Sequence, residues 1–152
     1  MKVDTIKIQK EICNAMLNRN ARLTCGEIEN DTIAVTVNGF AAYALPKSEC
    51  IFDIKKIPTR NDIQFAKLFE RNQNDKLLTV TPLTVDMMNG GNKTTLRRLT
   101  CEDFDCFVDV CLLKQLEDGN LYGYDRLGRI LVQDDFGCPL AVIMPTRYEL
   151  EY

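Results

Sequence analysis

The sequence predicts an α+β fold, built largely of antiparallel sheet, in one domain that spans residues 1–152. Two observations carry this prediction: helical and strand-like hydrophobic patterns occur in blocks, and turn signals separate consecutive strand segments. The predicted order is a helix, three strands, a helix, two strands, a helix and three strands. Because single strands do not alternate with helices, a parallel doubly wound sheet is not expected.

The first block begins with a short strand at residues 2–8 that leads into a helix at residues 9–20. The helix is predicted from apolar residues at helical spacing, namely Ile12, Cys13, Met16 and Leu17. The dipeptide Asn38-Gly39 is a strong hairpin signal. Strands are expected at residues 22–28, 32–37, 40–45 and 50–57.

The second block combines one helix with a hairpin. The helix is expected from residue 61 or 62 to about residue 71, and its inward face would comprise Phe65, Leu68 and Phe69. Pro82 marks an edge or a bulge in the extended segment that follows. The expected extended segments are residues 76–87 and 93–99, joined by a turn at residues 89–92.

The third block opens with the most regular helical pattern, over residues 100–117. Thr100 and Asp103 form an acidic version of the capping box. The apolar face would comprise Phe104, Phe107, Val108, Cys111, Leu112 and Leu116. Asp118-Gly119-Asn120 is expected to end this helix. The last three strands are expected at residues 121–124, 129–133 and 139–144.

The composition excludes several kinds of chemistry. The chain has no His, so a Ser-His-Asp triad, a Cys-His pair and a histidine metal ligand are impossible within it. The net charge is −3, and it is uneven: residues 1–76 carry a net charge of +2, and residues 77–152 carry −5. Neither half has the basic excess that is typical of nucleic-acid-binding proteins.

The cysteines and the hydropathy indicate a cytoplasmic protein. Seven cysteines are scattered along the chain, an odd number that suits reduced and mostly buried thiols. The first residues contain no apolar segment of the kind that directs export. No apolar stretch approaches the length of about 20 residues that a membrane-spanning helix needs. We therefore expect no membrane association.

Two hairpins of the chain are similar to each other. Residues 32–49 read TIAVTVNGF-AAYALPKSE, and residues 129–149 contain RILVQDDFG and PLAVIMPTRYE. Each pair has a strand, a turn with glycine, and an apolar strand that ends at proline, and each follows a predicted helix. The sequence is thus consistent with two pseudo-symmetric helix-plus-hairpin repeats, at about residues 1–58 and 93–148. The alternative is an unrelated single-domain α+β fold.

The segment Val142-Ile143-Met144-Pro145-Thr146-Arg147 resembles the end of the bacterial DNA sliding clamp, the processivity subunit of replicative polymerase. This resemblance implies a fold of paired helix-and-sheet repeats and a role in replication. A clamp ring contains six such domains, so this chain would need further copies or partners. The predicted third helix departs from the clamp pattern, because its acidic residues would repel DNA. Those residues are Glu102, Asp103, Asp105, Asp109 and Glu117, against Lys114 alone.

Two groups of residues are candidates for binding. The nucleic-acid contacts of a clamp-like protein would be Lys10, Arg19, Arg22, Lys67 and Arg71. The alternating tail could extend a sheet edge toward a partner chain through Tyr148, Leu150 and Tyr152. For both groups, the simpler interpretation is a solvated surface or the end of a sheet.

Candidate catalytic and metal-binding residues have weaker support. The carboxylates of residues 102–109 suit the first turn of a helix. Cys101, Cys106 and Cys111 lack the spacing of zinc ligands. The residues around Gly90-Gly91 lack the spacing of a phosphate loop and fit a hairpin turn.

We therefore expect a non-catalytic binding or assembly protein, without cofactor or metal, that engages another protein or itself. The alternative is a nucleic-acid-associated replication accessory factor, which the charge disfavours. A carboxylate- or thiol-dependent enzyme is the third hypothesis.

Overall fold

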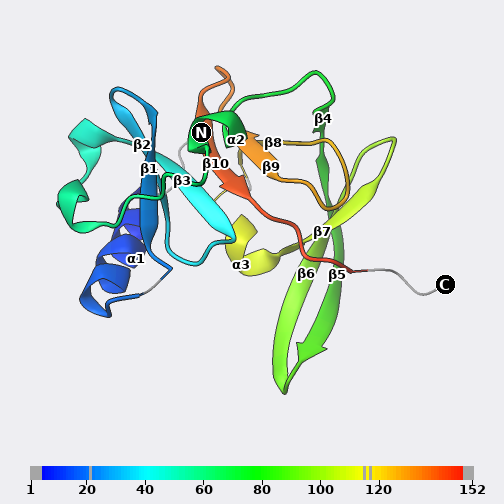
Figure 1. Ribbon diagram of the computed structural model, residues 1–152. Coiled ribbons are helices and arrows are strands. Elements are labelled where there is room, and N and C mark those ends of the chain that lie inside the picture. Colours follow the sequence, from blue (N-terminus) through cyan, green and yellow to red (C-terminus); the bar gives the residue numbers. More distant parts are fainter. Residues whose placement is uncertain (1–4, 21, 115, 117, 149–152) are drawn as a thin grey trace.

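The computed structural model describes residues 5–20, 22–114, 116 and 118–148, and it confirms the α+β fold class. The strands β1 to β10 are Thr24–Glu29, Thr32–Thr36, Ala41–Pro46, Lys76–Leu77, Thr79–Asn89, Asn92–Thr100, Asp105–Asp109, Asn120–Gly123, Ile130–Gln133 and Pro139–Ile143. They form a seven-stranded sheet of order β1-β2-β3-β10-β9-β8-β4 and a three-stranded sheet of order β5-β6-β7 (Figure 1). Neighbouring strands in both sheets are antiparallel.

The centre of the large sheet is the pairing of β3 with β10. Ala41 pairs with Ile143, and Tyr43 pairs with Ala141, so the start of β3 lies beside the end of β10. The predicted turn at Asn38-Gly39 joins β2 to β3. The Oδ1 atom of Asn38 accepts hydrogen bonds from the backbone N–H groups of Phe40 (2.8 Å) and Ala41 (3.0 Å).

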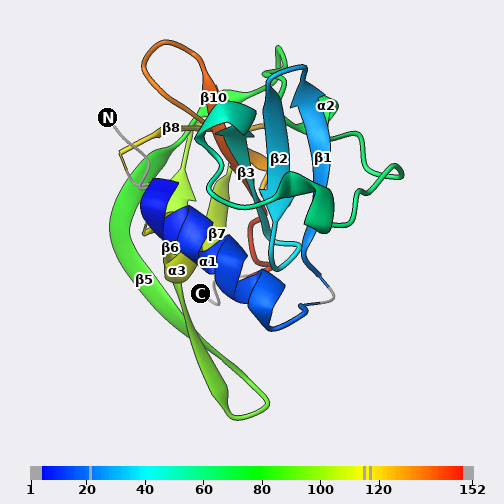
Figure 2. The ribbon, with the colours of Figure 1, turned by 90° about the vertical axis from the view of Figure 1, so that its left-hand side faces the viewer.

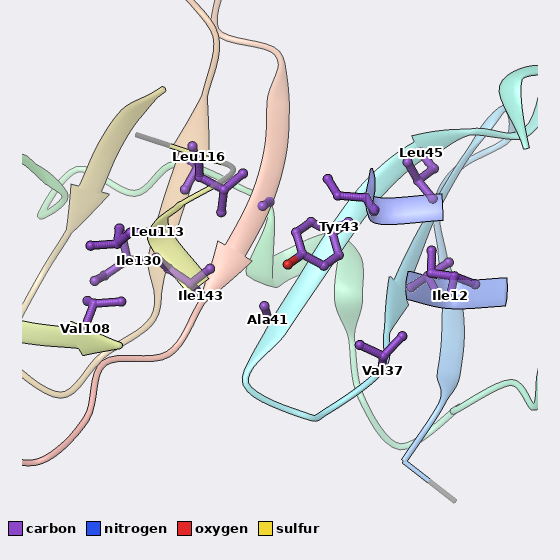
Figure 3. Close-up of a cluster of buried hydrophobic side chains, with 14 of the residues drawn as sticks. Ile12, Val37, Ala41, Tyr43, Leu45, Val108, Leu113, Leu116, Ile130 and Ile143 are labelled. Atoms are coloured by element: carbon purple, nitrogen blue, oxygen red, sulfur yellow. The ribbon is translucent and has the colours of Figure 1, made fainter. Parts of the chain in front are cut away.

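Helix α1, Thr5–Leu17, packs on one face of the large sheet (Figure 2). Ile8, Ile12 and Ala15 contribute its buried stripe. They join a core that includes Ile33, Val35, Val37, Tyr43, Leu45, Val108, Leu113, Ile130 and Ile143 (Figure 3). The expected strand at residues 2–8 is wrong from residue 5 onward, because the helix has already begun there. Residues 2–4 lie outside the described residues.

The opposite face of the large sheet is covered by helix α2, Phe65–Leu68, and the segment around it. Phe65 and Phe69 are buried in a second cluster, together with Ala34, Ala42, Leu131 and Val142. Alternate residues of β2 point to opposite faces, so Ala34 belongs to this cluster, whereas Ile33 and Val35 belong to the first. Helices α1 and α2 therefore lie on opposite faces of one sheet.

The helix expected at residues 61–71 is reduced to the four residues of α2. The reason lies in the preceding segment, which runs along β1: Cys25 donates its N–H to the carbonyl of Pro58, and Arg60 donates to the carbonyl of Cys25, both at 2.9 Å. Asp62, which was expected to cap a helix, instead forms an ion pair with Arg60.

The expected strand at residues 50–57 is also wrong. That region contains the short 3₁₀ helix η2 (Ile54–Lys56), and a second one, η1 (Lys47–Glu49), directly precedes the region. Asp53 caps η2 by accepting a hydrogen bond from the N–H of Lys55 at 3.1 Å. A local side-chain cap thus stabilises a turn where apolar alternation suggested a strand.

The small sheet contains a long hairpin formed by β5 and β6. Its far end projects from the body of the molecule (Figures 1 and 2). The turn at its tip is the one predicted at residues 89–92, where Gly90 and Gly91 have φ angles of 59° and 89°. A bulge between Val80 and Thr84 accommodates Pro82, as the sequence predicted.

The helix expected at residues 100–117 is the largest error. Residues 105–109 form strand β7, and only Val110–Leu113 form the short helix α3. Cys106, Phe107 and Val108 are buried one after another, and such a run fits a buried strand as well as a helix. Thr100 does not cap a helix: its hydroxyl donates to Asp105 at 2.5 Å.

Apart from the edge strand β4, the strand order of the large sheet is symmetric about the β3–β10 pair, because each of these strands is the third of three consecutive strands. The segments before the two units differ, since a 13-residue helix precedes β1 and a four-residue helix precedes β8. The pseudo-symmetric repeat therefore stays a prediction.

Candidate functional site

The main candidate site is an apolar groove of about 500 Å³ on the α2 face of the large sheet. Ala42 and Val142 from the central strands lie at its base, and Phe65 and Leu68 from α2 form one side. The remaining lining residues are Arg22, Thr24, Thr36, Asn38, Gly39, Phe40, Ala41, Arg60, Ile63 and Met144. We refer to this site as the apolar groove.

Two exposed apolar side chains line the apolar groove and also the second hollow described below. Phe40 is 54% exposed and Met144 is 37% exposed, although both are large and hydrophobic. The N–H of Met144 donates to the carbonyl of Phe40 at 2.8 Å, which ties the two together. Thr36 accepts a hydrogen bond from the N–H of Gly39 at 3.0 Å, so the turn that carries Phe40 is held on both sides.

Two arginines give the groove a basic edge. The guanidinium of Arg60 pairs with Asp62, and this hydrogen bond lowers the pKa of the Asp62 carboxyl. The side chain of Arg22 is exposed and forms no ion pair with any of the residues that the structure describes. An acidic group of a ligand would therefore find one unpaired guanidinium beside the apolar surface.

A second hollow, also of about 500 Å³, lies on the other side of the Asn38–Phe40 turn. Its lining includes the carboxylates of Glu11 and Asp109, and we call it the acidic hollow. Burial, together with the charge of Glu11, raises the pKa of Tyr43 to about 12. The neighbouring Asp109 carboxylate raises the pKa of Cys111, so this exposed thiol stays protonated near neutral pH and is a poor nucleophile.

The five basic residues suggested for nucleic-acid contact do not form one surface. Lys10 lies on α1, whereas Lys67 lies on α2, on the opposite face of the large sheet. Arg19 follows α1 with a φ angle of 51°. The guanidinium carbon of Arg71 stacks 4.0 Å from the ring centroid of Tyr122. Only Arg22 lines the apolar groove.

The surroundings of Lys67 also weaken a phosphate-binding interpretation. Its side chain lines a shallow hollow beside α2 together with Glu27 and Glu70. Carboxylates at this position offset the positive charge that a phosphate contact would need.

The candidate tail residues are described only in part. Tyr148 packs edge-on against Phe107, with ring centroids 4.9 Å apart. Thr146 forms a single bridge with Phe107, so Thr146 and Tyr148 both lie beside β7. Leu150 and Tyr152 lie outside the described residues, and their edge-pairing role stays a prediction.

The acidic residues of segment 102–109 have separate structural roles. Asp105 accepts hydrogen bonds from Thr100 and from Arg98, the latter at 2.8 Å. Asp109 caps α3 by accepting from the N–H of Cys111 at 2.9 Å. Among the described residues, no group of three or more His, Cys, Asp or Glu side chains is arranged to hold a metal ion.

The three cysteines of this region differ in their environments. Cys106 is buried, and burial raises the pKa of its thiol to about 12. Cys101 is half-buried, and Cys111 is exposed at the acidic hollow. All three are free thiols in the structure.

Sequence analysis missed Phe40, Arg60 and Met144 as members of the site. Phe40 and Met144 were predicted as the first residue of the strand 40–45 and the last residue of the strand 139–144, without a role in binding. A signal was present: Phe40 directly follows the Asn38-Gly39 turn, and Met144 directly precedes Pro145, so each lies at a strand end. Antiparallel pairing of β3 with β10 then brings the two ends together.

In the described part of the chain, no helix is long and apolar enough to cross a membrane. No protein-family model, curated protein or solved structure matches this chain.

Proposed function

We propose that this chain is a non-catalytic protein-binding module whose apolar groove receives an apolar side chain from a partner protein. The observation that carries this proposal is the exposure of Phe40 and Met144 beside a groove whose base is already apolar. Large exposed hydrophobic side chains that gather at one concave site are typical of interaction surfaces. Such a site gains its binding energy mainly by removing apolar area from water.

The architecture supports this proposal because it makes the groove rigid. Its base belongs to the two central strands of the large sheet, and hydrogen bonds hold the turn that carries Phe40. A preformed site loses little conformational entropy when a ligand binds. Arg22 at the edge, which has no ion-pair partner among the described residues, favours a ligand with a carboxylate beside its apolar side chain.

The proposal includes a cytoplasmic location, which the seven free thiols support. It also retains the resemblance to a sliding-clamp domain, since Val142 and Met144 of the clamp-like ending both line the groove. The nucleic-acid alternative has less support, because its five candidate residues are spread over opposite faces of the large sheet.

The test is selection of binding peptides from a random library, followed by mapping of the bound peptide with NMR chemical shifts. We expect peptides with one large apolar residue near Asp or Glu, and we expect shifts at Phe40, Leu68 and Met144. The variant Met144→Glu should lose this binding, since it places a charge at the groove. The matched control Ile51→Ser removes another exposed apolar side chain, on the segment that contacts Gln9 of α1, and should bind normally.

Two results would contradict the proposed function. One is a peptide that changes the chemical shifts of residues outside the groove, and the other is a peptide that binds Met144→Glu as tightly as the wild type.

A further inference from the structure

The loop between β9 and β10 presents the most exposed large hydrophobic side chain of the described residues. Phe136 is 93% exposed at the tip of this loop, so almost none of its ring contacts the rest of the chain. A second molecule that covers this ring would remove its apolar area from water, which favours association.

The loop holds Phe136 in a defined conformation. The Oδ1 atom of Asp134 accepts hydrogen bonds from the N–H groups of Phe136 (2.8 Å) and Cys138 (2.9 Å). Gly137, with a φ angle of 81°, closes the turn and donates to the carbonyl of Asp134 at 3.1 Å. Asn120 on β8 donates to Asp135 at 3.1 Å. Such an ordered loop loses little entropy on binding, as suits an anchor residue.

Phe136 and the apolar groove lie at opposite ends of β10. The groove contains Met144, which follows the end of β10, whereas Phe136 precedes its first residue, Pro139. Figure 2 shows the orange loop before β10 at one end of the large sheet and the β2–β3 turn at the other. The five residues of β10 span about 16 Å, so Phe136 cannot reach the groove of its own chain.

The loop and the groove are complementary in charge. The groove has a volume of about 500 Å³, which is more than one phenyl ring fills, and its base is apolar. Asp135 directly precedes Phe136, and Arg22, which has no ion-pair partner among the described residues, lies at the edge of the groove. A ring that enters the groove would bring these opposite charges together.

We propose that the partner of the apolar groove is the β9–β10 loop of a second copy of this chain, with Phe136 as the anchor. This inference rests on the proposed protein-binding function and names its partner. Because the loop and the groove are different surfaces, the contact is heterologous, and repeated contacts form either a closed ring or an open filament.

Sedimentation of the full chain over a range of concentrations tests the inference. The wild type should form oligomers as its concentration rises. Phe136→Ser and Met144→Glu should each weaken self-association by about thirtyfold or more, as loss of an anchor residue does. The control Ile51→Ser should assemble like the wild type, and circular dichroism should confirm that each variant is folded.

A mixing experiment separates this contact from others. Phe136→Ser retains an intact groove, and Met144→Glu retains an intact loop. An equimolar mixture therefore contains one working contact per pair, and it should form a dimer and nothing larger. Should Met144→Glu fail to fold, Arg22→Glu at the exposed edge replaces it in the mixture.

Charge reversal provides a second, independent test. Arg22→Glu and Asp135→Arg should each weaken self-association, and the chain that carries both substitutions should recover part of the loss. The inference is overturned if the wild type stays monomeric up to millimolar concentration, if Phe136→Ser assembles normally, or if the mixture stays monomeric. If peptides bind in the groove but the wild type is monomeric, only this inference is contradicted. If neither peptide binding nor self-association is observed, the proposed function is contradicted as well.

Discussion

At the scale of single residues, Arg129 and Asp75 form a buried ion pair. The guanidinium of Arg129 donates to both carboxylate oxygens of Asp75, each at 2.8 Å, and the Asp75 side chain has no exposed surface. Arg129 also donates to the carbonyl of Glu70 at 2.9 Å, and the N–H of Asn72 donates to Asp75 at 2.7 Å. This ion pair links the segment after α2 to the start of β9. Because α2 forms one side of the apolar groove, the pair also helps to hold that side in place.

Asp75→Asn should therefore destabilise the fold in a way that depends on pH. Burial alone would raise the pKa of Asp75, but the hydrogen bonds from Arg129 and Asn72 outweigh burial, so the net pKa is lowered. A lowered folded-state pKa means that the stabilisation is present above the unfolded pKa of about 3.9 and is lost as the pH falls through the folded value. Removing one partner of a buried pair costs about 3–5 kcal/mol at neutral pH.

The measurement is urea unfolding of the wild type and Asp75→Asn at a series of pH values. The difference in the free energy of unfolding should be largest near neutral pH and should shrink in acid. Asp62→Asn, at the exposed Arg60 pair, is the matched control and should change the stability little. A difference that is independent of pH would show that the charge of Asp75 is not what holds the segment.

At the scale of elements, the sequence was sufficient where the signal is local. The apolar spacing around Ile12 predicted α1, although Leu17 of the predicted stripe is exposed and Ile8 and Ala15 are buried instead. Asn38-Gly39 predicted the β2–β3 turn. The sequence was insufficient for β7, because the run from Cys106 to Val108 is buried on all sides and has no distinct period. Pairing with β6 makes this segment a strand, and this tertiary contact cannot be predicted from the local sequence pattern.

The candidate site has the same limit. Arg22 was selected from the sequence as a possible phosphate contact, and it does lie at the apolar groove. Phe40 and Met144 are 104 positions apart in the chain, and only the β3–β10 pairing places them side by side. Their exposure depends on where each strand ends, which is the least predictable property of an element.

The contact between β1 and α2 yields a prediction at this scale. Gly26 on β1 lies under Phe65, and a Cβ atom there would be 2.3 Å from Cδ2 of the Phe65 ring. Gly26→Ala should therefore push α2 away from the sheet, at a cost of about 1–3 kcal/mol, and weaken ligand binding in the groove. Thermal unfolding and peptide titration measure the two effects.

The compensating variant identifies the cause of that loss. Phe65→Leu removes the edge of the ring, so the double variant Gly26→Ala with Phe65→Leu should recover part of the stability. If the double variant is simply the sum of two losses, the steric explanation fails, and the strand itself would be what requires glycine.

At the scale of the whole molecule, the large sheet separates two surface hollows, the apolar groove and the acidic hollow. The large sheet has α1 on one face and α2 on the other, so the apolar groove and the acidic hollow open on different sides of the Asn38–Phe40 turn. The β9–β10 loop extends from the far end of the same sheet. In the proposed contact, Phe136 would be the anchor at one end of the sheet and the apolar groove the receptor at the other, an arrangement that would favour repeated head-to-tail contacts.

This arrangement predicts that self-association weakens as salt is added. The acidic residues beside Phe136 and the arginines at the groove attract one another, and the screening length falls from about 10 Å at 0.1 M salt to about 3 Å at 1 M. Burial of the phenyl ring has no such dependence, because sodium chloride screens charges and leaves apolar transfer nearly unchanged. The dissociation constant of the wild type, measured by sedimentation, should therefore rise with sodium chloride, and that of Arg22→Gln should rise less. Equal salt dependence in both proteins would show that Arg22 does not face the acidic loop, and the contact would then depend on the ring alone.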